Sequence, residues 1–186
     1  KPLFNEGFKQ AFNIPRPTDI PKNRNYIAIA KDTLYLSRKL HVSPYALTND
    51  FIGNALYVSH GIYSDSINDY EGILETSLND KLVLIEFDIP KNKKKKAGDK
   101  SKISSRILEA KKRGAKNIIL LSKKNSKNNK ISNYTFSKLQ EIDVNVSIVY
   151  GKKWSRKIHR SKKPIISVTN VSKRNAEGFN VGGVLD

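Results

Sequence analysis

The sequence predicts a β-rich α+β fold, of the open β-barrel or sandwich kind with one or two flanking helices. Short apolar runs with β-branched or aromatic residues recur along the chain between turn-forming residues, as is typical of strands. Only the segment from about Lys102 to Arg113 shows clear helical spacing. The chain has 186 residues and is 38% hydrophobic, which allows one modest core with short flanks. At least seven strands against one or two helices favour the α+β class.

The first 24 residues are predicted to form an extended connector. Pro15, Pro17 and Pro21 remove backbone donors and restrict the residues before them. Apolar residues alternate between Phe8 and Ile14, which favours a strand, although the phenylalanine spacing also fits a helix.

The next elements are a hairpin and two separate strands. Residues 26–30 and 34–36 are apolar and flank a turn-prone Lys-Asp pair, so they predict a hairpin. Residues 55–58 and 82–87 are the clearest strands. The acidic stretch between them, residues 64–80, predicts a polar connector with one helical turn. A solvated connector is favoured over an acid–base pair or a Ca²⁺ site because no EF-hand pattern is present.

A βαβ-like unit follows from residue 82 to residue 121. Residues 91–102 are predicted to be a loop, because four consecutive lysines repel one another and Gly98 breaks regular structure. Ser101 or Asp99 is the expected N-cap of the helix, and Gly114 is its expected left-handed C-cap. The apolar face of that helix comprises Ile103, Ile107, Leu108 and Ala110.

The last third of the chain is predicted to alternate between polar segments and strands. The expected elements are a Lys/Asn loop at 122–132, a helix at 134–141, and strands at 144–150, 164–171 and 179–185. No apolar run approaches the roughly 18 residues of a membrane span, so no transmembrane segment is expected.

The net charge of +18 is the strongest bulk signal. Of the 35 basic residues 27 are Lys, whereas bidentate recognition of phosphate and guanine favours Arg, so a compositional bias is favoured over nucleic-acid binding. The best nucleic-acid candidate is the basic segment 150–160, in which Trp154 could stack a base beside Arg156. The alternative is a solvated loop whose Trp154 packs onto the domain.

Catalytic and cofactor-binding patterns are missing from the sequence. His41, His60 and His159 lie far apart, and no His-Glu-x-x-His or Gly-x-Ser-x-Gly motif is present. The chain has no Cys, so thiolate nucleophiles and Cys-based zinc sites are excluded. We therefore predict no catalytic, cofactor-binding or metal-binding residue in this chain.

Several short motifs together resemble a known domain. They are the stretches 35–45, 54–62, 69–73, 80–85 and 107–122, with the flanks 1–12 and 179–186. The segment 54–62 leads through Ser59, His60 and Gly61, and the segment 107–122 passes from a helix through Gly114 into a strand. This order resembles the protease-associated (PA) domain inserted in zinc aminopeptidases of the M28 family. His60 stands where many relatives carry an aromatic residue, and segment 91–102 is unusually basic.

The resemblance implies a non-catalytic domain that covers the active-site approach, with residues 25–172 as the PA-like domain. Residues 1–24 and 173–186 would connect it to a catalytic peptidase domain of the same polypeptide, which would hold the zinc. With no Met, the chain is expected to be a fragment. The partners implied are that catalytic domain and a peptide substrate, with nucleic acid not expected, and the implied location is secreted, periplasmic or envelope-associated. The candidate interaction residues are His60, Tyr63, Asp69, Tyr70, Lys93, Lys94, Trp154 and Arg156.

Overall fold

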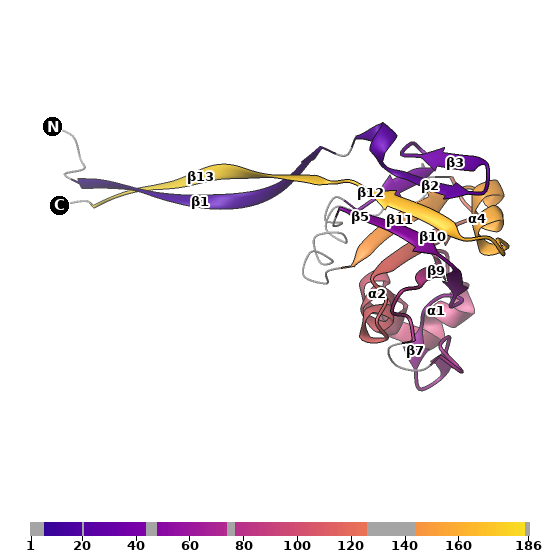
Figure 1. The fold of residues 1–186 in the computed structure, drawn as a ribbon. Coiled ribbons are helices and arrows are strands. Elements are labelled where there is room, and N and C mark those ends of the chain that lie inside the picture. The colour runs from indigo at the N-terminus through magenta and orange to yellow at the C-terminus, as the bar shows by residue number, and fades with distance from the viewer. Residues whose placement is uncertain (1–5, 20, 44–47, 74–76, 126–143, 185–186) are drawn as a thin grey trace. The chain divides into compact units, whose positions relative to one another are not determined.

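The computed structural model describes residues 6–19, 21–43, 48–73, 77–125 and 144–184, with side chains described from residue 21 to residue 171 (Figure 1). The chain forms two compact units. One comprises Lys1–Asp19 with Ser172–Asp186, and the other comprises Ile20–Val171.

The first unit is a two-stranded antiparallel ribbon. Strand β1 (Glu6–Asp19) pairs with β13 (Ser172–Val184), and the register places Glu6 opposite Val184. The strands predicted at 8–14 and from 179 onward are therefore confirmed. Because the strands are antiparallel, the incoming and outgoing chain lie side by side along the whole ribbon.

The second unit is built around a five-stranded sheet with the order β4-β11-β10-β9-β6. Its strands are β4 (Leu40–Val42), β6 (Ala55–Tyr57), β9 (Leu82–Glu86), β10 (Asn117–Ser122) and β11 (Asn145–Tyr150). All neighbours are parallel except β4, which runs antiparallel to β11. Every residue of β9 and β11 is buried, because both faces of the sheet are covered.

A four-stranded antiparallel sheet with the order β3-β2-β12-β5 packs against this first sheet. Its strands are β2 (Tyr26–Ile29), β3 (Asp32–Tyr35), β5 (Asn49–Gly53) and β12 (Ile165–Thr169). Strands β2 and β3 form the predicted hairpin, and Tyr26 pairs with Tyr35. A small hairpin of β7 (Tyr63–Ser64) and β8 (Ile67–Asn68) lies in the acidic connector.

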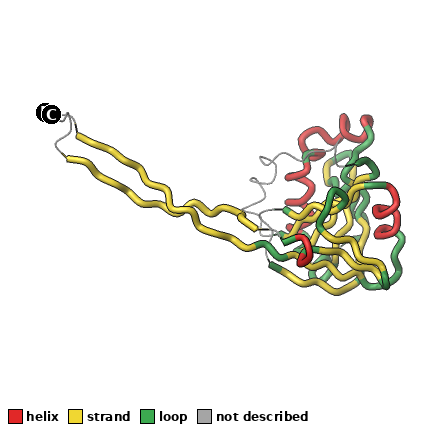
Figure 2. Tube along the Cα trace, turned by 90° about the horizontal axis from the view of Figure 1, so that it is seen from above, coloured by secondary structure: helices red, strands yellow, loops and turns green. Residues whose placement is uncertain are grey.

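Three α-helices are present in the described residues: α1 (Lys91–Ala97), α2 (Ile103–Lys112) and α4 (Lys152–His159). Short 3₁₀ turns span Lys22–Arg24 and Gly98–Ser101. Figure 2 shows the helices in red beside the strands of the globular unit. The prediction of a β-rich α+β fold is confirmed.

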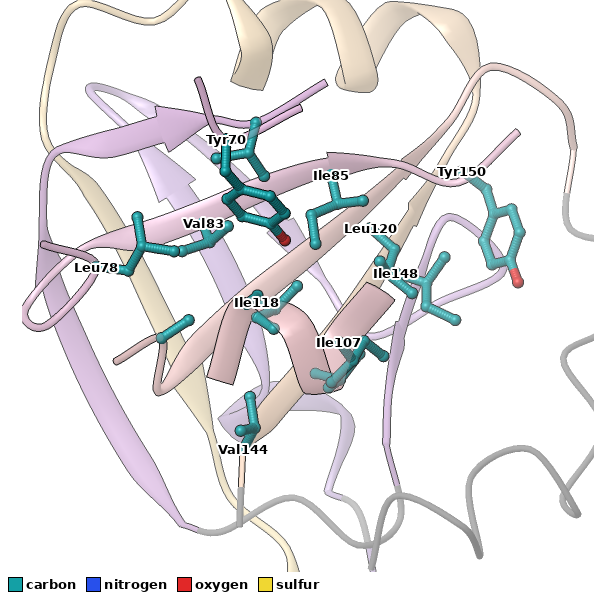
Figure 3. Packing of buried hydrophobic residues seen from close by; sticks show 14 residues of the cluster. Tyr70, Leu78, Val83, Ile85, Ile107, Ile118, Leu120, Val144, Ile148 and Tyr150 are labelled. Carbon is teal, nitrogen blue, oxygen red and sulfur yellow. The ribbon is translucent and has the colours of Figure 1, made fainter. Parts of the chain in front are cut away.

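Two apolar clusters hold this unit together, one on each face of the parallel sheet. Val83 and Ile85 of β9 face α2, where Ile107 and Ala110 are fully buried (Figure 3). Leu82 and Leu84 face the opposite way, toward the four-stranded sheet and Ile158 of α4. Alternate residues of one strand therefore supply both clusters.

Three local predictions are wrong, including that of Leu108 on the buried face of α2, since this side chain is exposed. Residues 91–97 form a helix, because Pro90 can precede a first turn, Ala97 is buried and most of the lysines remain exposed. Lys102 is the N-cap of α2 without a side-chain cap, since Asp99 pairs with Lys102 and the Ser101 hydroxyl donates to the Gly98 carbonyl. The basic segment from residue 152 onward also begins with a helix, α4, where a loop was the alternative considered. The helix predicted at 134–141 lies outside the described residues.

Gly114 ends α2 as predicted. Its φ is +92°, and its N–H donates to the Lys111 carbonyl. A Cβ at this position would overlap the Asn79 side chain and lie 3.1 Å from the Asn79 backbone nitrogen. Both the left-handed backbone and the close approach therefore require glycine.

Candidate functional site

Polar side chains gather where the parallel strands end. Ser59 and His60 follow β6, Glu86 ends β9, and Ser122 ends β10. The carboxyl ends of parallel strands meet at one edge of a sheet, which is where open sheets of this kind bind ligands. The parallel pairing of β6, β9 and β10 thus brings these residues to the same edge.

A tight turn fixes His60 at this edge. Ser59 has a φ of +50° and Gly61 a φ of +67°, and the Glu86 N–H donates to the Ser59 carbonyl over 2.7 Å. A Cβ on Gly61 would lie 3.0 Å from Ile85 Cδ1 and 3.1 Å from the Tyr70 hydroxyl. Gly61 is therefore needed for the chain to pass this close to the core.

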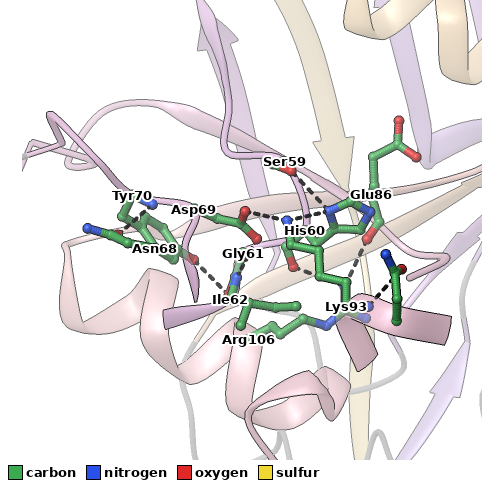
Figure 4. A network of polar contacts seen from close by, with 11 residues as sticks. Ser59, His60, Gly61, Ile62, Asn68, Asp69, Tyr70, Glu86, Lys93 and Arg106 are labelled. Atoms are coloured by element: carbon green, nitrogen blue, oxygen red, sulfur yellow. Dashed lines mark hydrogen bonds and ion pairs between the residues drawn. The ribbon is translucent and has the colours of Figure 1, made fainter. Parts of the chain in front are cut away.

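Lys93 of α1 links His60 to Asp69 (Figure 4). Its ammonium lies 3.1 Å from His60 Nδ1 and donates to Asp69 Oδ1 over 2.6 Å. The other carboxylate oxygen of Asp69 accepts the Ile62 N–H over 3.0 Å. The Asp69 side chain is only 7% exposed, so this ion pair is largely shielded from water.

These contacts set the protonation state of His60. An ammonium can only donate, so Nδ1 must accept and the imidazole proton resides on Nε2. Burial, reinforced by the Lys93 charge, lowers the pKa of His60 below its usual value. Ser59 Oγ also lies 2.9 Å from Nδ1, so the hydroxyl and the ammonium share one acceptor. His60 is consequently neutral at pH 7, and its Nδ1 is already engaged.

Arg106 of α2 joins the ends of the two strands beneath this network. Its side chain is buried, and its guanidinium donates to the carbonyls of His60 at 3.1 Å, Glu86 at 2.8 Å and Phe87 at 3.2 Å. Burial lowers its pKa to about 10. Arg106 therefore holds the strand ends through backbone acceptors, with no carboxylate partner among the described residues.

Two further ion pairs lie along the same edge. Lys123 pairs with Glu86 at 3.0 Å, and Lys124 pairs with Asp88 at 3.1 Å. The two ion pairs neutralise the lysines that follow β10.

The Glu86 carboxylate also lies near Tyr57. Burial and this carboxylate raise the pKa of Tyr57 to about 12.

A cavity of about 430 Å³ opens where β11 ends and α4 begins. Its walls carry four cationic and two aromatic side chains: Arg38, Lys39, Lys152, Lys153, Tyr150 and Trp154. None of the described residues that line it is a carboxylate.

The network around His60 is suited to holding a loop rather than to proton transfer. The Nδ1 atom that could deprotonate Ser59 faces the Lys93 ammonium, and the two Lys93 contacts join α1 to His60 and to Asp69. The described residues contain no group of three His, Asp or Glu side chains placed to hold a metal ion. They therefore do not fit the zinc site of an aminopeptidase.

The candidates predicted from the sequence fall into three groups. His60, Asp69 and Lys93 meet in one network, and the Tyr70 hydroxyl donates to the Gly61 carbonyl beside it over 3.5 Å. Tyr63 is exposed, and the Arg113 guanidinium lies 4.8 Å from its ring centroid.

The remaining candidates lie away from this network. Trp154 is half-buried against the second apolar cluster, as the alternative to base stacking predicts, and it also lines the cavity. Lys94 and Arg156 are exposed on α1 and α4.

Sequence reasoning missed Arg106, Arg38 and Lys39. Arg106 is a basic residue within an amphipathic helix, and nothing local distinguishes it from an exposed one. Arg38 and Lys39 join the cavity only because β4 pairs with β11 across the sheet. A pairing of strands so distant in sequence leaves no signal in a short window.

Comparison with known proteins gives a result at the level of the fold. No protein-family model matches the chain, and no curated protein matches its sequence. An aminopeptidase from Aneurinibacillus sp. strain AM-1 is similar in structure, with a TM-score of 0.51 and 16% identity over 95% of this chain. BSAP, a zinc aminopeptidase from Bacillus subtilis, has a TM-score of 0.51 and 13% identity over 95% of this chain.

The likeness covers most of this chain but a minority of each enzyme. The chain spans 37% of the length of the first enzyme and 36% of the second. At such low identities the comparison shows a shared fold.

No helix among the described residues is long and apolar enough to cross a membrane.

Proposed function

We propose that this chain is a non-catalytic, PA-like domain of an M28-like zinc aminopeptidase. In this proposal it covers the approach to the active site of a catalytic domain in the same polypeptide, where it limits peptide access or mediates protein contacts. The zinc and the catalytic groups belong to that catalytic domain. The parent enzyme is secreted, periplasmic or associated with the cell envelope.

The observation that carries the proposal is the uneven coverage of the structural neighbours. The fold matches over 95% of this chain but only 37% and 36% of the two aminopeptidases. A domain that is a minority part of a larger peptidase would give this pattern. Its contribution would then be to position and to select substrates, since fold alone does not carry chemistry.

The ribbon supports an inserted position within the parent chain. Glu6 lies opposite Val184 in the register of β1 and β13. A domain whose entering and leaving strands run side by side can be placed in a loop of another domain without separating the ends of that loop.

The network around Lys93 supports a rigid role for the globular unit. Asp69, His60 and the backbone of Ile62 are held together by a shielded ion pair and its hydrogen bonds. Arg106 ties the neighbouring strand ends together. A covering domain acts through shape and surface charge, and both require a fixed loop geometry.

The activity of the chain by itself provides the first test. The 186-residue chain and the complete product of its native gene are each assayed with leucine p-nitroanilide in the presence of zinc. We expect hydrolysis by the complete product and none by the 186-residue chain. Hydrolysis by the 186-residue chain would overturn the non-catalytic role, and an inactive complete product would remove the peptidase context.

The alternative of a basic nucleic-acid-binding module receives no support from the structural neighbours. Trp154 packs against the core, and the Lys157 ammonium lies 5.4 Å from its ring centroid. We therefore put forward no second function.

A further inference from the structure

We propose that the cavity at the start of α4 binds a small phosphate monoester that carries an apolar or aromatic group. The cavity is bounded by Arg38 and Lys39 on one side and by residues 150–154 on the other. This proposal stands on the cavity itself and does not depend on the role in a peptidase.

The first argument is that four positive charges gather in this cavity. Arg38, Lys39, Lys152 and Lys153 line it, and none of the four forms an ion pair with a carboxylate in the described part of the chain. Cations gathered in a concave surface focus the field and raise the local concentration of anions. The surface thus favours an anionic occupant.

Some lysines next to the cavity do form ion pairs. Lys123 and Lys124 follow β10 at the same edge of the sheet. Lys123 pairs with Glu86, the last residue of β9, and Lys124 pairs with Asp88. Lys157, one turn further along α4 than Lys153, pairs with Asp32. Lysines without an ion pair also occur elsewhere among the described residues, and Asp32 interacts electrostatically with Lys153 as well as with Lys157. What distinguishes the cavity is that four cations gather on one concave surface.

The second argument concerns the kind of anion. Arginine binds carboxylate and phosphate alike through paired hydrogen bonds, and lysine binds phosphate as a compact point charge, so the number of charges rather than the type of cation selects the anion. Four positive charges are better matched by a phosphate monoester, which carries nearly two negative charges at pH 7, than by a single carboxylate.

The third argument is the size and lining of the cavity. A volume of about 430 Å³ falls within the range of small-molecule sites and exceeds what one inorganic anion fills. Trp154 and Tyr150 supply an aromatic wall. At Gly151 a Cβ would meet no atom of the described residues within 4 Å, so they leave space beside the backbone. An apolar or aromatic group attached to the phosphate would occupy this part.

The test uses the fluorescence of Trp154, the single Trp of the chain, as a reporter inside the cavity. The 186-residue protein is titrated at constant ionic strength with phenyl phosphate, inorganic phosphate and phenylacetate. We expect saturable binding of phenyl phosphate, weaker binding of inorganic phosphate, and the weakest binding for phenylacetate. The Lys152→Ala/Lys153→Ala double variant should bind phenyl phosphate at least about tenfold more weakly, as expected for the loss of charged contacts.

A matched variant separates a site from general charge. Lys94→Ala/Lys95→Ala removes the same two charges from the exposed surface of α1 and should leave the affinity for phenyl phosphate within about twofold. Arg38→Ala, on a different segment, should weaken binding as the α4 double variant does. Circular dichroism confirms that each variant is folded.

Three results would overturn the proposal. The first is that the Trp154 fluorescence shows no saturable change up to about 10 mM phenyl phosphate. The second is an equal loss of affinity for phenyl phosphate in the α1 and α4 double variants, and the third is binding of phenylacetate as tight as that of phenyl phosphate. The last result would assign the cavity to carboxylates. Equal affinity for phenyl phosphate and inorganic phosphate would contradict the role of the aromatic wall.

Discussion

Replacing Arg106 with Met tests how the ends of β6 and β9 are held together. Met replaces the aliphatic stem of Arg but lacks the guanidinium and donates no hydrogen bond. The substitution therefore leaves the carbonyls of His60, Glu86 and Phe87 without the guanidinium that they share. The Arg106 side chain is buried, so water does not readily take its place.

The expected loss of stability follows from two opposing terms. A hydrogen bond from a charged donor is worth about 1.5–3 kcal/mol, and three are lost. Burial lowers the pKa of Arg106 from 12.5 to about 10, which corresponds to about 3 kcal/mol by which burial disfavours the charged form. Because Met removes the bonds and this penalty together, we expect a net loss of about 2–5 kcal/mol in the free energy of unfolding.

The assay is urea unfolding followed by the fluorescence of Trp154. Arg156→Met on the exposed surface of α4 serves as the matched control and should change the free energy of unfolding by less than about 0.5 kcal/mol. If Arg106→Met is as stable as the wild-type protein, the carbonyls do not depend on the guanidinium, and the reasoning fails.

Three further predictions concern the turn after α2 and the network at the sheet edge. Gly114→Ala should cost about 2–3 kcal/mol in urea unfolding and Gly72→Ala about 1 kcal/mol, because both have positive φ but only Gly114 lacks space for a Cβ; equal costs would contradict the clash with Asn79. A double-mutant cycle of Lys93→Met and Asp69→Asn, measured by urea unfolding, should give a coupling free energy of about 1–2 kcal/mol. This exceeds the coupling of most exposed ion pairs because the Asp69 side chain is only 7% exposed. A coupling free energy near zero would mean that water screens the pair. Burial lowers the pKa of His60 in the folded chain, so as the pH falls below about 6.5 the unfolded chain takes up a proton at this residue first. The free energy of unfolding should therefore decline between about pH 7 and pH 5, by at most about 1.4 kcal/mol per pH unit from His60. His60→Gln should make that decline shallower, and an unchanged slope would exclude His60 as its source.

The unit of β9, α2 and β10 could be predicted from the sequence because its signals are local. Residues 82–85 and 118–121 are continuous apolar runs, and Gly114 marks the end of the helix between them. Each signal lies within one element and does not depend on a distant partner.

The helix at 91–97 could not be predicted in the same way. Four adjacent lysines argue against regular structure when they are considered alone. In the folded chain Lys93 forms an ion pair with Asp69, which lies 24 residues earlier, and Ala97 is buried. A contact between elements thus favours a helix that the local sequence disfavours.

The buried face of α2 shows the same limit. Apolar spacing places Leu108 on the buried face, yet Leu108 is 43% exposed and Arg106 is buried in the core. The acceptors that make this possible are carbonyls at the ends of two strands. Backbone groups carry no sequence signal, so only the fold reveals that an arginine belongs there.

The most direct test of the proposed covering role compares substrates of different length. In the complete gene product, residues 21–171 are replaced by a short Gly/Ser linker that keeps β1 and β13. The kcat/KM for a long peptide is then divided by that for leucine p-nitroanilide, before and after the replacement. We predict that this ratio rises by about tenfold, which equals about 1.4 kcal/mol of barrier that the domain imposes on long substrates. An unchanged ratio in an active enzyme would contradict the claim that this domain controls access to the active site.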